Sequence, residues 1–139
     1  MIKLNAKMYL QSIYFLDVKI NSNKERVRRY KEQAENRTSK QSPDRVQTSS
    51  RMQKMADAVV LYSDIEKSIE EDEAKKQEIV DTIGMLNPNE SVVLYKCYVD
   101  GMSLKEAAKA ISRSYSWVSK RHLDGIESVQ KILDARVYA

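Results

Sequence analysis

The sequence predicts an all-α fold in two parts: a long antiparallel helical hairpin with the pattern of a coiled coil, and a smaller C-terminal helical domain. Three observations support this prediction. Only three glycines and two prolines occur in 139 residues that are rich in helix formers. Apolar residues recur at alternating spacings of three and four through most of residues 1–85. In residues 86–139, two shorter amphipathic patterns meet at a polar turn.

The first long helix is predicted from an apolar seam whose spacing follows the a and d positions of a heptad repeat. Asn23 is the polar member of this seam. A polar residue there either fixes the register or partner orientation, or marks a place where the seam weakens. The seam consists of Ile2, Ala6, Tyr9, Ile13, Leu16, Ile20, Asn23, Val27, Tyr30 and Ala34.

A polar connector is predicted at residues 38–50, where the apolar pattern stops and Pro43 occurs. Two interpretations of Asp44 to Ser50 are open. Arg45 and Gln47 could contact nucleic acid, or the segment could dock against the helices, which we favour.

A second long helix is predicted to begin at Ser50, because Gln53 completes a capping box with it. The run from Glu66 to Glu73 is acidic, whereas the run from Lys24 to Lys31 is largely basic. An antiparallel hairpin would bring these opposite charges together. The seam of this helix consists of Met55, Ala58, Tyr62, Ile65, Ile69, Asp72, Lys76, Ile79, Ile83 and Leu86.

Two helices alone leave the flanks of their apolar stripes exposed to water. A second copy of the chain, the C-terminal domain or a foreign partner could cover them. We favour a homodimer formed through the N-terminal helices, because aromatic residues exceed what one seam needs. These residues are Tyr9, Tyr14, Phe15, Tyr30 and Tyr62.

The C-terminal domain contains two helical patterns around a turn at Ser112 to Ser114. Ser103 and Glu106 form a capping box for the first helix, and Ser114 can cap the second. The inward stripes are Leu104, Ala107, Ala108 and Ile111 in the first helix, and Val118, His122 and Ile126 in the second. Such a helix-turn-helix can insert one helix into the major groove of DNA, although paired amphipathic helices also occur in domains that bind no DNA.

The outward face of the second of these helices combines hydroxyls, aromatic rings and cations, which can contact base edges and phosphates. For Trp117 we favour contact with a thymine methyl or a sugar over packing on the neighbouring helix. Arg121 is expected to contact the DNA backbone, while Arg113 either reaches a phosphate or lies in solvent. The candidate DNA-binding residues are Arg113, Ser114, Tyr115, Ser116, Trp117, Ser119, Lys120 and Arg121.

The segment from Leu86 to Ile126 resembles region 4 of bacterial sigma factors and the regulators that share its helix-turn-helix. The ordered matches are Leu86, Pro88, Glu90, Val93, Leu94, Tyr98, Gly101, Met102, Ser103, Leu104, Glu106, Ala107, Ala108, Ser114 and Val118. The resemblance implies binding to double-stranded DNA, with RNA polymerase as a further partner.

The chain departs from this family pattern in two places. Ser112 and Arg113 stand where the family has glycine and a hydrophobic residue, which leaves the tightness of the turn open. Gly125 replaces the usual alanine, which disfavours a helix by roughly 1 kcal/mol. We therefore expect the helix to bend or fray before Ser128.

The order of connector, long helix and region 4-like segment is also similar to small phage and prophage regulators of Gram-positive bacteria, including the ArpU and RinA groups of late-gene activators. This resemblance implies a phage-encoded transcription regulator that acts by occupying a promoter. Separately, the single cysteine, Cys97, cannot form a disulfide within the chain, so we expect the protein in the reducing cytoplasm.

An enzyme is not expected. His122 is the only histidine, so the usual histidine and cysteine metal sets and catalytic pairs are missing, and no glycine-rich phosphate loop occurs. The acidic residues 70–73 project in different directions around a helix. We therefore expect no catalytic residue, cofactor or metal. We also expect no membrane association, because the apolar stretch from Met8 to Leu16 is too short to span a bilayer.

Two other functions remain open. A small terminase-like DNA-packaging subunit also joins a helix-turn-helix to a helical oligomerisation region, but it would form a ring of many copies. A helical adaptor would use the C-terminal domain to bind protein instead of DNA. The net charge of +4 permits DNA binding without requiring it.

Overall fold

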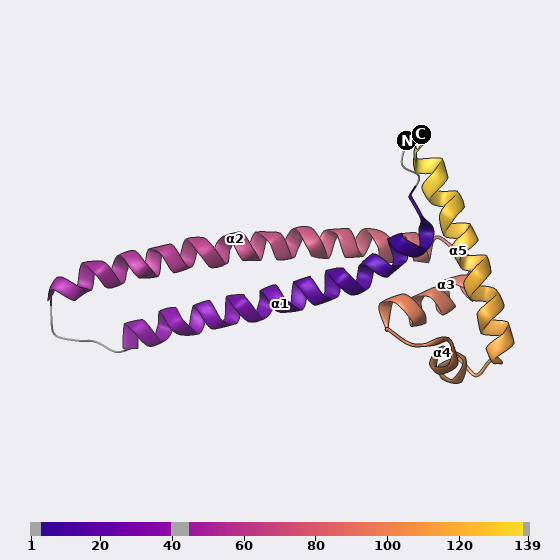
Figure 1. Cartoon of the computed structure of the whole chain (residues 1–139), viewed down its shortest axis with the longest axis horizontal. Coiled ribbons are helices and arrows are strands. Elements are labelled where there is room, and N and C mark those ends of the chain that lie inside the picture. Colours follow the sequence, from indigo (N-terminus) through magenta and orange to yellow (C-terminus); the bar gives the residue numbers. More distant parts are fainter. Residues whose placement is uncertain (1–3, 40–44, 138–139) are drawn as a thin grey trace. The chain divides into compact units, whose positions relative to one another are not determined.

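The computed structural model describes residues 4–39 and 45–137, and all its elements in these ranges are helical, with no strand (Figure 1). The all-α fold class is confirmed for this part of the chain. None of its helices is both long and apolar enough to cross a membrane. The elements are α1 (Ala6–Ser39), α2 (Arg45–Gly84), α3 (Pro88–Leu94), the π-helical turn η1 (Tyr95–Val99), α4 (Leu104–Ala110) and α5 (Tyr115–Val137).

The chain divides into two compact units. One unit is Val18–Ala74, and the other combines the described residues up to Asp17 with those from Lys75 onward. The domain boundary predicted between residues 85 and 86 lies inside the second unit, and that division stays a prediction.

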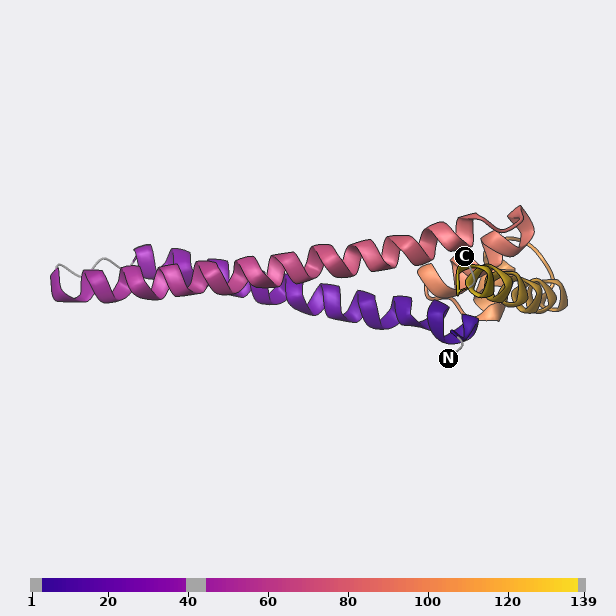
Figure 2. The same cartoon turned by 90° about the horizontal axis from the view of Figure 1, so that it is seen from above.

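In the unit Val18–Ala74, parts of α1 and α2 lie side by side, as both Figure 1 and Figure 2 show. Ion pairs join the basic run of α1 to the acidic run of α2. Lys24 Nζ lies 3.1 Å from Glu73 Oε1, and Lys31 Nζ lies 3.0 Å from Glu66 Oε1. These four side chains are about half exposed, so each pair contributes little stability, on the order of 1 kcal/mol or less. Together they favour the antiparallel register.

The polar stretch between the long helices is shorter than the sequence predicts. Residues 38 and 39 belong to α1 and residues 45–50 belong to α2, while residues 40–44 lie outside the described part. Gln53 Nε2 donates to Asp57 Oδ1 at 3.1 Å instead of turning back to form a capping box. The predicted helix start at Ser50 is therefore wrong: α2 begins at Arg45, and no glycine or proline lies between Pro43 and Ser50 to prevent this earlier start. The docking expected for Asp44 to Ser50 concerns side chains that lie outside the described part of the chain.

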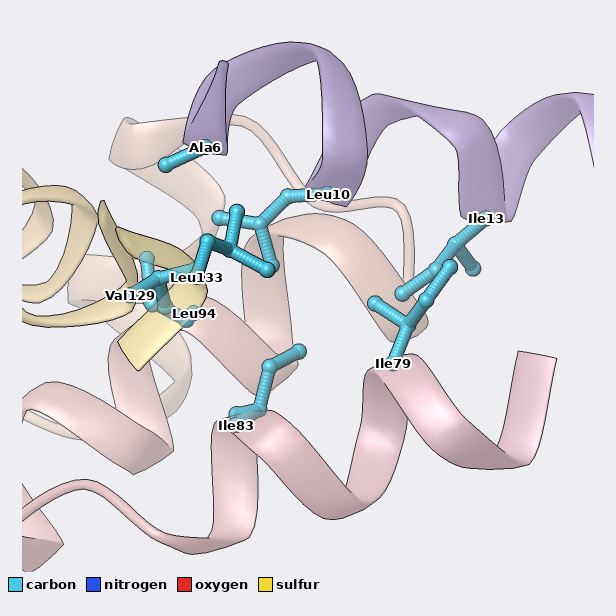
Figure 3. Close-up of a cluster of buried hydrophobic side chains, with 8 residues drawn as sticks. All are labelled: Ala6, Leu10, Ile13, Ile79, Ile83, Leu94, Val129 and Leu133. Atoms are coloured by element: carbon cyan, nitrogen blue, oxygen red, sulfur yellow. The ribbon is translucent and has the colours of Figure 1, made fainter. Parts of the chain in front are cut away.

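The core of the other unit joins the start of α1 and the end of α2 to α3 and α5 (Figure 3). The start of α1 is tied to α5 through Gln130, whose Oε1 accepts from Ala6 N–H at 2.8 Å and whose Nε2 donates to the Leu4 carbonyl at 2.8 Å. Burying each large aliphatic side chain contributes about 1.5–3 kcal/mol. The core consists of Ala6, Leu10, Ile13, Ile79, Ile83, Leu94, Val129 and Leu133.

α5 is continuous through Gly125, so the fraying expected before Ser128 is wrong. Gly125 is buried against α3. A Cβ at this position would lie 3.0 Å from both Cγ and Cδ1 of Leu94. The glycine thus permits close packing of α5 on α3, and this tertiary contact outweighs its weak helix propensity.

α3 is fixed by its first residues and by one polar contact. Asn87 caps it, because its Oδ1 accepts from Glu90 N–H at 3.0 Å, and Pro88 occupies the first helical turn. The Glu90 side chain is buried, and its Oε2 accepts from Ser128 Oγ at 2.9 Å. Glu90 therefore connects α3 with α5.

Candidate nucleic-acid interface

α4 lies against the start of α5 through small side chains. Ser103 caps α4, because its Oγ accepts from Glu106 N–H at 3.1 Å. Ala107 and Ala108 are buried in a second core cluster with Val118 and with Val93 of α3. Because alanine is small, the two helices can approach closely at this point.

The turn between α4 and α5 closes in the manner of a Schellman motif. Arg113 N–H donates to the Ala108 carbonyl at 3.0 Å, and Ser112 N–H donates to the Lys109 carbonyl at 3.4 Å. Ser112 adopts the left-handed conformation with φ of 56°. The turn is therefore closed although no glycine occupies it, and Ser112 carries the backbone strain that a glycine would avoid.

The start of α5 presents polar and aromatic side chains to solvent. Ser114 caps the helix by accepting from Trp117 N–H at 3.2 Å. Val118, Gly125 and Val129 are buried on one side of α5. Of the predicted residues, Arg113, Ser114, Tyr115, Ser116 and Lys120 are exposed, and Trp117, Ser119 and Arg121 are half-buried.

Trp117 lies between two arginines. The Arg113 Cζ atom lies over the indole at 4.9 Å from the ring centroid, and the Arg121 Cζ atom lies over it at 5.5 Å. Trp117 also packs partly against the second core cluster. Arg121 Nη1 lies 3.4 Å from Asp124 Oδ2. The indole is therefore in contact with protein groups and is less open than Tyr115.

Leu123 was missed in the sequence-based choice of site residues. Its side chain is 61% exposed, although it is a large aliphatic residue in a helix. It follows Ser116 and Lys120 at helical spacing, so the three share one outward face. An exposed leucine next to a serine and a lysine can supply an apolar contact to a thymine methyl. The spacing from Ser116 was the signal that could have found it.

The sequence around this face is strongly basic. Between Ser103 and Ile126 there are five lysines and arginines against two carboxylates, in a chain whose net charge is +4. Lys105 and Lys109 of α4 are exposed, as is Lys120 of α5. This excess of cations suits a polyanionic ligand.

Burial shifts the pKa values of His122 and Cys97 and makes both side chains less reactive. Burial lowers the pKa of His122, with a smaller effect from Lys7, and raises the pKa of Cys97. The phenol of Tyr98 lies 2.9 Å from His122 Nε2. His122 is thus a neutral hydrogen-bonding residue near pH 7, and Cys97 stays a thiol.

Among the described residues, no group of three histidine, cysteine, aspartate or glutamate side chains could hold a metal ion. No family model, curated protein or solved structure matches the chain.

Proposed function

We propose that this protein is a sequence-specific regulator of transcription that binds double-stranded DNA through α4 and α5 as a helix-turn-helix. One observation carries the proposal. The start of α5 is fixed from behind by buried Val118 and capped by Ser114, while Ser116, Lys120 and Leu123 face outward. Such a helix end can enter the major groove and offer hydroxyl, cationic and apolar contacts to base edges.

The mechanism is occupancy of a promoter by a phage- or prophage-encoded protein, with RNA polymerase as a further contact. The region 4-like residues Leu86 to Ile126 support this proposal. In the structure they form α3, the cap at Ser103, the turn at Ser112 and the start of α5. Glu90, one of the residues that match region 4, connects α3 to α5 by accepting a hydrogen bond from Ser128.

We also propose that two copies of the chain associate through the N-terminal helices. Three large apolar side chains of α1 support this part: Met8 and Phe15 are each 69% exposed, and Tyr14 is 66% exposed. A two-fold dimer would present two copies of α5 to half-sites spaced by about one helical turn of DNA, roughly 34–36 Å.

The test is selection of bound fragments from a random DNA pool, with Lys120→Ala and Tyr115→Ala compared against Lys131→Ala. Lys131 is exposed on α5 about three turns beyond Lys120, past the start of the helix that is proposed to contact the bases. We expect the first two variants to change the selected sequence or to lose affinity, and Lys131→Ala to match the wild type. Equal behaviour of all three variants would contradict the proposed reading face.

Light scattering on the purified chain tests the mode of action. A dimer agrees with a regulator, whereas a ring of many copies would identify a DNA-packaging subunit. If the protein binds no DNA duplex at low salt, the function left is that of an adaptor whose C-terminal domain binds another protein.

A further inference from the structure

Arg113, Trp117 and Arg121 stand four residues apart and form one row across the turn and the start of α5. Both guanidinium groups lie over the indole ring, with Cζ atoms 4.9 Å and 5.5 Å from its centroid. A guanidinium stacked on an aromatic ring keeps the N–H donors along its edge available. The ring therefore orients two cations without consuming their hydrogen-bonding capacity.

This row has fewer anionic partners than cations. Among the described residues Arg113 has no acidic partner, and Arg121 has Asp124 at 3.4 Å. Nε of Arg121 is buried and has no acceptor. An anion beside these guanidinium groups would add an electrostatic attraction that Arg113 does not receive from any described carboxylate. The two non-bridging oxygens of a phosphodiester can accept a bidentate pair of hydrogen bonds from a guanidinium group.

The same contacts leave little of Trp117 for a base. Its side chain is half-buried, packs partly against the second core cluster and is covered by the two guanidinium groups. An aromatic ring needs a free face or edge to pack on a thymine methyl or a sugar. The side chains of Ser116, Lys120 and Leu123 are exposed, so they are free to contact bases.

We infer that Trp117 is a positioning residue that holds Arg113 and Arg121 as a paired contact for the phosphates of one DNA strand, and that it does not itself read a base. This inference rests on the proposed function. It assigns backbone contact to the arginine row and sequence reading to the exposed residues Tyr115, Ser116, Lys120 and Leu123.

The test is a fluorescence anisotropy titration of a labelled duplex at several salt concentrations. Arg113→Gln and Arg121→Gln should each make the negative slope of log K against log salt less steep by about 0.9. Each should weaken binding to selected and random duplexes alike. Lys131→Gln, which removes an exposed cation from the same helix, should leave the slope unchanged.

The decisive variants keep both arginines and change the ring. Trp117→Leu should weaken binding by about five- to thirtyfold through loss of two stacking contacts, and Trp117→Phe should recover most of that loss. In the Trp117→Leu background, Arg113→Gln should cost less than it does in the wild type. Circular dichroism at the assay temperature confirms that each variant is folded, and Trp117→Phe carries the comparison if Trp117→Leu is not.

The possible failures differ. If each arginine substitution costs the same factor with or without the indole, the arginines act independently of Trp117, and the inference is wrong while DNA binding stands. If Trp117→Phe changes the selected sequence, the indole reads a base, and the inference is again wrong. If the wild type binds no duplex at low salt, the proposed function fails and the inference fails with it.

Discussion

Gly125→Ala separates the intrinsic preference of a helix from the packing that surrounds it. In an exposed helix this substitution stabilises by about 1 kcal/mol. At Gly125 the new Cβ would lie 3.0 Å from Cγ and Cδ1 of Leu94 and 3.3 Å from Cδ2. Leu94 is 0% exposed and is enclosed by the core, so it has little room to withdraw. Overpacking of this kind costs about 1–3 kcal/mol. We therefore expect a net destabilisation of about 1 kcal/mol.

The assay is urea unfolding of the full chain, followed by far-ultraviolet circular dichroism. The pair Glu127→Ala and Glu127→Gly provides the control, because Glu127 is exposed on the same helix and reports propensity without a contact. Leu94→Ala should itself cost about 2–5 kcal/mol. In that background Gly125→Ala should become stabilising by about 1 kcal/mol, since the obstructing side chain is gone. A stabilising effect in the wild-type background would refute the packing argument.

Three further predictions concern stability. Ser112→Gly should raise the unfolding free energy by about 0.5–1 kcal/mol in urea, because relief of the left-handed strain exceeds the added flexibility of the unfolded chain, and a loss would contradict this. The lowered pKa of His122 means that the unfolded state binds its proton more readily, so stability should fall as pH drops below about 6.5. His122→Phe should reduce that fall, and an unchanged pH profile would show that other groups cause it. Asp72 is 3% exposed and its Oδ2 lies 3.2 Å from Lys19 Nζ without a well-aligned hydrogen bond. Asp72→Leu should therefore be neutral or stabilising by about 1–4 kcal/mol, and Lys19→Ala should destabilise, as thermal melts can measure.

The apolar periodicity predicted the helices and most of the buried positions. Ile13, Ile20, Val27, Ile69 and Ile83 belong to the predicted seams and are buried. Periodicity succeeds here because a helix places residues three and four apart on one face. It did not predict that α1 extends to Ser39 or that α2 begins at Arg45, because the polar residues on either side of Pro43 can continue a helix as well as form a loop.

The candidate site was predicted in part. The capping serines Ser103 and Ser114 act as the sequence suggests, since a cap depends on residues within one turn of the helix. The contact of Trp117 with Arg121 agrees with their spacing of four residues in α5. The contact of Trp117 with Arg113 depends on the conformation of the turn before α5, and periodicity carries no information on that turn. Leu123 was assigned to no site because an aliphatic residue in a helix is usually expected to be buried.

The sequence by itself determined the all-helical class, the seams, the caps at Ser103 and Ser114 and the basic character of residues 103–126, because each depends on spacing and composition along the chain. Only the tertiary structure decided that α5 continues through Gly125, that Glu90 connects α3 to α5, and that the guanidinium group of Arg113 lies over the indole of Trp117. These features depend on contacts between residues that are distant in sequence or separated by a turn. Local preferences of about 1 kcal/mol are outweighed wherever such packing supplies more.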